Sequence, residues 1–299
     1  MSVPAAFIGV VLIWATTPLA IKWSSESGGF LFGVTARMLI GVFVCLVLVA
    51  LMSRRMRWHR NASLTYVAAG LGIWGAMTSV YWASQFIPSG LVSVLFGLTP
   101  IATAVMAALW LGEQALTPSR LLGIGLGIAG LSLILGQGVA LGGHALLGIA
   151  GVLLSVLIHS GSAVWVKRIG ARLHPLETTT GALLIAVPLF VVSWSLFDGQ
   201  PPAAIGPRAF WSILYLAVLG SVVGFILYYY VLHRMQASRV ALVTLITPVL
   251  ALLLGQMLND EVLTLRTWIG SAAVLGGLAC FEWGETLQRR LIQSCQPPR

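Results

Sequence analysis

The sequence predicts an all-α integral membrane protein whose ten transmembrane helices form two inverted five-helix repeats. Composition, a series of apolar stretches and an internal repeat together predict this fold. Apolar residues make up 58% of the 299 residues and charged residues only 8%, and the mean hydropathy is +0.96. Because soluble proteins carry about 25% charged residues, this composition excludes a water-soluble globular protein.

Ten stretches of the chain have the length and composition of a membrane span, which requires about 20 apolar residues. The connections between them are short and rich in Gly, Pro and Ser, so no soluble domain is expected. We expect the first stretch to be retained as a span, because no basic segment of a signal peptide precedes it. The stretches cover roughly residues 4–22, 31–53, 64–85, 90–111, 120–136, 145–166, 179–197, 209–232, 239–258 and 267–284.

The internal repeat is clearest where Ser89–Glu113 matches Ala237–Glu261 at an offset of 148 residues. Each copy contains a Thr-Pro pair in mid-helix and a Glu 13 residues after the proline. A repeat of this length in an apolar chain indicates two homologous helix bundles. We therefore divide the chain into repeats at 1–138 and 143–286, followed by a cytoplasmic tail at 287–299.

The basic residues predict how the spans cross the membrane. The net charge of +9 would suggest nucleic acid in a soluble protein, but here Lys and Arg lie mostly between apolar stretches. With both termini in the cytoplasm, the inner loops and the tail hold 13 of them and the outer loops hold three, as the positive-inside rule requires. Five spans per repeat then give the repeats opposite orientations, an arrangement suited to alternating access in a cell inner membrane.

The two Thr-Pro pairs predict a break in each matched helix. A proline removes one helical hydrogen bond and frees the carbonyl four residues earlier. Such a carbonyl must face protein or a wet cavity in a membrane, although a simple packing kink is the alternative. We predict hinges at Pro100 and Pro248 and cavity groups at Phe96, Thr99, Thr244 and Thr247.

Four helical faces combine aromatic and polar side chains, which are costly toward lipid unless they have partners. The alternative for the aromatic residues alone is a place at the membrane interface. We predict that these faces line a substrate cavity, with Trp14 and Thr17 in the first span, Trp74, Thr78, Tyr81 and Gln85 in the third, Ser155, His159 and Ser162 in the sixth, and Tyr229 and His233 in the eighth.

Charged groups are scarce inside the spans. Arg37 is the one charge well inside a span; we interpret it as structural, reaching the interface or backbone carbonyls, with binding of a substrate carboxylate as the alternative. Glu113 and Glu261 lie at span ends, where we expect them to cap a helix or pair with loop arginines. No carboxylate lies deep in a span, so only His159 and His233 are candidates for proton coupling.

No sequence motif indicates a cofactor, a metal site or a catalytic centre. Gly125, Gly127 and Gly130 match the dinucleotide-binding pattern, but no strand precedes them. We interpret these glycines as points of close helix packing. No cofactor or metal is therefore expected.

The block ending in Thr99-Pro100 and Gly112-Glu113, within two five-helix halves, resembles the EamA family of the drug/metabolite transporter superfamily. The second copy departs from the pattern, with Asp260 in place of the glycine. The resemblance implies a central cavity lined by helices one, three, four, six, eight and nine. It also implies export of amino acids, other metabolites or drugs. Among the members of the family, the aromatic-rich interior of this chain is similar to that of an aromatic amino acid exporter.

The sequence thus predicts an exporter of small organic metabolites, amino acids being the favoured cargo, that acts by alternating access. The alternatives are an exchanger of sugar phosphates or nucleotide sugars, and an intramembrane enzyme with a lipid-linked substrate. The expected partners are a small-molecule substrate and the lipid bilayer. No nucleic acid is expected, and the protein would be a monomer or a homodimer.

Overall fold

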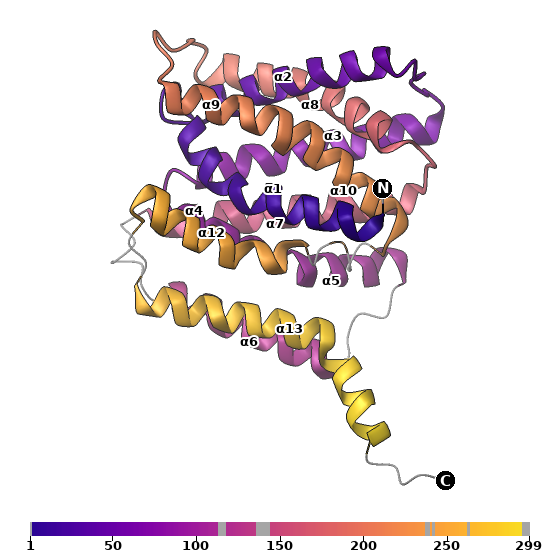
Figure 1. Cartoon of the computed structure of the whole chain (residues 1–299), viewed down its shortest axis with the longest axis vertical. Helices are drawn as coiled ribbons and strands as arrows, with labels where there is room; N and C mark the ends of the chain where they lie inside the picture. The colour runs from indigo at the N-terminus through magenta and orange to yellow at the C-terminus, as the bar shows by residue number, and fades with distance from the viewer. Residues whose placement is uncertain are drawn as a thin grey trace.

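A computed structural model of the chain describes residues 2–112, 118–135, 144–236, 240, 243–261 and 264–294, and all regular structure in these ranges is helical (Figure 1). The helices are α1 (Val3–Ser24), α2 (Gly29–Leu51), α3 (Arg60–Ala83), α4 (Ser89–Phe96), α5 (Thr99–Leu111), α6 (Pro118–Leu135), α7 (Ala145–Ile169), α8 (Pro175–Phe197), α9 (Pro207–Tyr215), the π-helix η1 (Leu216–Val223), α10 (Gly224–Arg234), α12 (Val243–Asn259) and α13 (Leu265–Ser294).

Length and composition identify six helical segments among the described residues that can cross a membrane, namely Val3–Ser24, Gly29–Leu51, Ser89–Leu111, Ala145–Ile169, Pro175–Phe197 and Pro207–Arg234. Shorter apolar helices run over Leu121–Gly130, Leu250–Asn259 and Leu265–Phe281. The helical membrane architecture is confirmed, whereas the number of ten spans stays a prediction.

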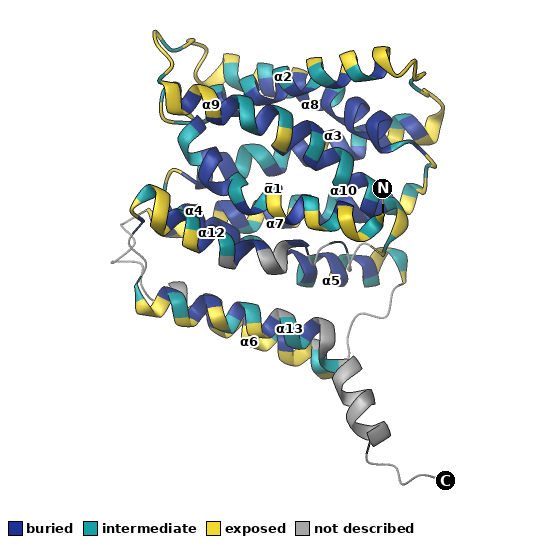
Figure 2. Cartoon of the chain, in the orientation of Figure 1, coloured by how far each residue is buried: buried dark blue, intermediate teal, exposed yellow. Residues whose placement is uncertain are grey.

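The outer surface of the helices is apolar, as a lipid-facing surface must be. Phe43, Leu109 and Trp211 are 67%, 76% and 64% exposed, and many other large apolar side chains are exposed too. Figure 2 shows exposed residues along the outer helices α2, α9, α6 and α13, with buried residues concentrated between them. An exposed apolar surface of this extent marks a membrane or interaction face.

The central helices α1, α3, α7 and α10 lie between two outer groups. At one edge α2 packs against α8 and η1, and at the other α6 lies beside α13 (Figure 1). Between these edges α3 contacts both α7 and α8, while α1 contacts α12, α9 and α10. The centre of the molecule is therefore the place where helices from both halves of the chain meet.

Glycines bring α6 and α13 into close contact. A Cβ atom added to Gly130 would lie 2.5 Å from the Gly270 carbonyl oxygen, and one added to Gly277 would lie 2.6 Å from the Gly123 carbonyl oxygen. Only glycine permits this backbone approach. Of the three glycines expected at packing points, Gly130 behaves so, whereas a Cβ at Gly125 would meet nothing within 4 Å.

The carboxylate of Glu261 joins three helices at one end of the molecule. It accepts hydrogen bonds from the backbone N–H groups of Ser89 (2.9 Å) and Gly90 (3.3 Å), which begin α4. It also pairs with the Lys22 ammonium at 3.3 Å and accepts from the Asn259 amide at 3.0 Å. The expected capping role agrees with this arrangement, but the paired cation is Lys22 rather than a loop arginine. Glu113 lies outside the described residues.

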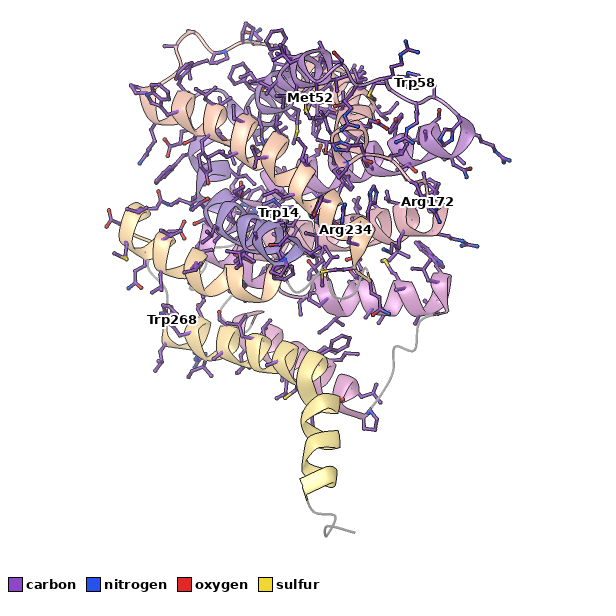
Figure 3. All side chains as sticks on the ribbon, turned by 45° about the vertical axis from the view of Figure 1, so that its right-hand side comes forward. Trp14, Met52, Trp58, Arg172, Arg234 and Trp268 are labelled. Carbon is purple, nitrogen blue, oxygen red and sulfur yellow. The ribbon has the colours of Figure 1, made fainter. Side chains whose placement is uncertain are left out.

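Basic side chains gather at the opposite end of the helices. Arg57 forms an ion pair of 2.9 Å with Glu177, which lies in the first turn of α8. Burial, together with the charges of Arg54, Arg234 and Arg57, lowers the pKa of His174 at the start of that helix. Trp58 and Arg172 point outward on this side in Figure 3.

Candidate functional site

A cavity of about 90 Å³ lies at the centre of the helix bundle. Six helical segments, α1, α3, α4, α7, α10 and α12, supply its wall, and α2 adds one arginine. These segments correspond to helices one, three, four, six, eight and nine of the expected arrangement. The lining residues are Trp14, Thr17, Pro18, Ile21, Arg37, Gly72, Ile73, Ala76, Met77, Val80, Val92, Ser93, Phe96, His159, Ser162, Ala163, Phe225, Tyr228, Tyr229 and Thr247.

Aromatic rings form one side of this cavity. The Trp14 ring lies 5.9 Å from the His159 ring and 5.2 Å from the Tyr228 ring, measured between centroids. The His159 and Tyr228 rings are 5.4 Å apart, and the Tyr228 and Tyr229 rings are 5.3 Å apart. These separations are typical of attractive ring contacts, and Figure 3 shows Trp14 in the interior of the bundle. The cluster presents flat apolar surface to a bound molecule.

Hydroxyl groups supply the polar part of the wall. Thr17 donates its hydroxyl proton to the Ile13 carbonyl at 2.9 Å, and Ser162 donates to the Ala68 carbonyl at 3.0 Å. A hydroxyl that donates in this way still has lone pairs with which to accept. The hydroxyls of Thr17 and Ser162 can therefore accept hydrogen bonds from a ligand.

The expected break at Pro100 is present, because α4 ends at Phe96 and α5 begins at Thr99. The Phe96 carbonyl, which would have bonded to the missing N–H of Pro100, accepts a hydrogen bond of 2.5 Å from the Thr99 hydroxyl. The second proline differs, because Pro248 lies inside the continuous helix α12. The sequence gives a reason for the difference. Gly97 at the first break is a poor helix former, whereas the corresponding residue of the second copy is Leu245, a good helix former.

We expect Thr99→Val to lower the free energy of unfolding by about 1–3 kcal/mol, because the half-buried Phe96 carbonyl loses its donor. Denaturant titration of the purified protein in detergent would measure the change. Thr17→Val is the matched control, since the Ile13 carbonyl that its hydroxyl contacts retains its helical hydrogen bond. Equal losses in the two variants would contradict a special role for the Thr99 hydroxyl.

Seven of the predicted site residues line the cavity. They come from five helical segments and include aromatic, hydroxyl and imidazole side chains. They are Trp14, Thr17, Phe96, His159, Ser162, Tyr229 and Thr247. Tyr81 is fully buried behind the wall, where its hydroxyl accepts from Arg37 at 3.4 Å.

The other predicted residues do not belong to the lining. Trp74 donates to Ser193 of α8 at 3.1 Å, Ser155 donates to the Ala76 carbonyl at 2.7 Å, and Gln85 is exposed beyond the end of α3. Thr78 and His233 are half-buried and also outside the lining. The side chain of Thr244 lies outside the described residues.

The difference between the predicted and the observed lining of α3 has a physical cause. The residues of this helix that line the cavity are Gly72, Ile73, Ala76, Met77 and Val80. They form one helical face of mostly small and apolar side chains, whereas the prediction selected the larger polar side chains beside it. Two of these polar side chains bond to other helices, Trp74 to Ser193 of α8 and Tyr81 to Arg37 of α2.

Tyr228, Phe225 and Arg37 are lining residues that the predicted set omits. Phe225, Tyr228 and Tyr229 share one helical face, so the aromatic spacing itself could have revealed the first two. Arg37 was interpreted as reaching the membrane interface, but its side chain is 1% exposed and lies at the cavity. Sequence position alone gives no measure of such burial.

Comparison with known proteins agrees with this architecture. The model of the EamA-like transporter family matches residues 2–136 and 146–282. An uncharacterized transporter of Archaeoglobus fulgidus is 30% identical, with 90% of this chain and 94% of that protein covered. The uncharacterized transporter YoaV of Bacillus subtilis strain 168 is 25% identical, with coverages of 93% and 96%.

Two further comparisons are with an inner membrane transporter and with a solved structure. The uncharacterized inner membrane transporter YedA of Escherichia coli K12 is 25% identical, with 94% of this chain and 91% of that protein covered. A crystal structure with 20% sequence identity matches 97% of this chain and 98% of its own with a TM-score of 0.71, which shows the shared fold. The chain belongs to the EamA-like transporter family and is a multi-pass membrane protein.

Proposed function

We propose that this transporter exports small organic metabolites, amino acids above all, across the inner membrane by alternating access. The central cavity carries the proposal, because both halves of the chain contribute to its wall. Its aromatic side suits an apolar side chain and its hydroxyl groups suit the polar part of a metabolite. The basic residues near His174 support a cytoplasmic location for that end of the molecule.

The helix packing supports two inverted repeats. In the sequence repeat, Gly123 corresponds to Gly270 and Gly130 to Gly277. The observed contacts join Gly123 to Gly277 and Gly130 to Gly270, so exchanging the two halves turns each contact into the other. The same holds for two other contacts. In the second half α9 and α10 correspond to α3, and α7 corresponds to α1. The contact of α3 with α7 thus becomes the contact of α9 and α10 with α1, and both are present. Contacts of this kind are expected from a two-fold axis in the membrane plane.

The size of the cavity supports a change of conformation during transport. A volume of about 90 Å³ is below the range of about 300–1,000 Å³ common for ligand sites. A metabolite would therefore need the surrounding helices to move apart. The contacts of Glu261 with Lys22 and with the start of α4 join the helix ends at one side, and they would separate when that side opens.

The alternatives receive less support from the lining. A phosphorylated substrate favours at least two cations, and Arg37 is the cation found among the described lining residues. An enzyme using both histidines would need them close together, but His159 lines the cavity and His233 does not. Transport of a metabolite with no more than one anionic group remains the function that this lining favours.

Uptake of labelled amino acids into proteoliposomes would test the proposal, with and without an imposed pH gradient. We expect saturable uptake of one class, which Tyr228→Ala reduces about tenfold through loss of its ring contacts. Tyr230→Ala is the matched control, because Tyr230 is on the same helix but outside the lining. Accumulation only with the gradient would indicate proton coupling.

Each remaining outcome rejects a different part of the proposal. If no amino acid enters, the assigned cargo class is wrong. If the Tyr228 and Tyr230 variants both match the parent protein, transport stands but the cavity is not the substrate site.

A further inference from the structure

Arg37 is the one charged side chain among the described residues of the cavity wall. It projects from α2 and is 1% exposed, so its guanidinium is withdrawn from bulk solvent. The remaining described lining is apolar, aromatic or hydroxyl-bearing, apart from the imidazole of His159. A permanently charged group in such surroundings is costly unless something compensates for its charge.

The protein supplies only neutral partners to this guanidinium within the described part of the chain. Nε donates to the Ser221 hydroxyl at 2.8 Å, and Nη1 donates to the Tyr81 hydroxyl at 3.4 Å. The described ion pairs are Lys22–Glu261, Arg57–Glu177 and Arg208–Glu26, none of which includes Arg37. Since a guanidinium carries five N–H donors, most of its donor capacity is available to a ligand.

The π-helix η1 holds one side of the guanidinium. It presents the Ser221 hydroxyl to Nε, and the adjacent Gly220 leaves space beside Nη2. A Cβ atom at Gly220 would lie 3.0 Å from Nη2, so a larger residue would crowd the arginine. Short π-helical turns within α-helices are frequent at functional sites, and this one orients a buried cation at the cavity.

We propose that Arg37 binds the carboxylate of the transported molecule, which is therefore an organic anion or a zwitterion with one carboxylate. The carboxylate would supply the missing counter-charge through a charge-assisted, two-point hydrogen bond. The aromatic side formed by Trp14, Phe225 and Tyr228 would receive the apolar part of the molecule. This inference rests on the proposed transport function and specifies its substrate class.

Matched pairs of ligands would test the charge requirement directly. Thermal stabilisation of the purified protein would be measured with L-phenylalanine and its amide, L-leucine and its amide, and hydrocinnamate and its amide. We expect the acids to bind about 10- to 100-fold more tightly than the amides, as a charged hydrogen-bonded pair implies. Arg37→Gln should abolish this preference, whereas Arg37→Lys should retain part of it, because a lysine keeps the charge without the planar fork.

Arg208→Gln is the control for loss of a positive charge, because Arg208 is exposed and pairs with Glu26 away from the cavity. It should bind acids and amides as the parent protein does. If Arg37→Gln does not fold, the preference of the parent protein and its partial retention in Arg37→Lys still decide the question.

Three results would overturn the assignment. The parent protein could bind acids and amides equally, or Arg37→Gln could keep an unchanged preference for acids. Inorganic phosphate could also raise the thermal stability of the protein while carboxylates do not. The transport proposal fails separately. If carboxylates bind through Arg37 but no labelled ligand enters proteoliposomes, the site stands and transport of these molecules fails. If an uncharged or cationic cargo enters equally with parent and Arg37→Gln protein, transport stands and the Arg37 inference fails.

Discussion

Glu261→Gln should lower the free energy of unfolding by about 2 kcal/mol, the scale of hydrogen bonds to a charged group. The carboxylate accepts from two backbone N–H groups at the start of α4 and pairs with Lys22 at the end of α1. Its side chain is 4% exposed, so water cannot easily replace these partners. The substituted amide keeps the shape but loses the negative charge and turns one acceptor into a donor.

Reversible unfolding in mixed detergent micelles would measure this loss, with Glu26→Gln as the matched control. Glu26 pairs with Arg208 through side chains that are 37% and 57% exposed. Exposed pairs contribute only about 0–1 kcal/mol, so the control should remain close to the parent protein. Similar losses in the two variants would show that the buried contacts of Glu261 contribute nothing beyond a surface ion pair.

The pH dependence of this difference gives a second check on Glu261. Burial raises the pKa of its carboxyl group, but the Ser89 N–H, the Lys22 ammonium and the Gly90 N–H outweigh burial and hold the pKa below its usual range. A group with a lowered pKa stabilises the folded state above its unfolded pKa of about 4.3. The advantage of the parent protein over Glu261→Gln should therefore persist at neutral pH and shrink as the pH falls below about 4.3.

The helical membrane fold could be predicted because its causes are local to the sequence. Apolar length determines where α1, α2 and α8 lie, and their bounds fall within a few residues of the expected spans. The break before Pro100 also follows from local chemistry, since proline removes a specific hydrogen bond. The contrast with Pro248 shows the limit of this reasoning, because a helix can accept a proline when its neighbours hold it in place.

The site could be predicted only in part, because a cavity depends on how helices are rotated about their axes. On α7, His159 and Ser162 line the cavity, whereas Ser155, predicted on the same face, donates to the Ala76 carbonyl of α3. On α3, the polar groups lie beside the apolar face that lines the cavity, and the sequence does not distinguish a contact with α8 from a cavity wall. Arg37 shows the same limit, since its depth depends on the contacts with Ser221 and Tyr81 from distant segments.

Gly123→Ala should lower the free energy of unfolding by about 2 kcal/mol, although a single methyl group is added. A Cβ atom at this position would lie 2.8 Å from the backbone nitrogen of Phe281 and against the Gly277 carbonyl. Backbone atoms cannot rotate away as a side chain can, so α6 and α13 must separate. Overpacking of a close contact typically costs about 1–3 kcal/mol.

Gly125→Ala is the control on the same helix, because a Cβ at Gly125 would meet nothing within 4 Å. It should leave stability unchanged or raise it by up to about 1 kcal/mol, because alanine favours a helix more than glycine does. The double variant Gly123→Ala/Gly277→Ala should lose less than the sum of the two single losses, because each substitution separates the same point of contact. Ligand binding should survive in Gly123→Ala, since no described residue of α6 or α13 lines the cavity. Equal effects of Gly123→Ala and Gly125→Ala would instead mean that the contact between α6 and α13 does not exclude a side chain at Gly123.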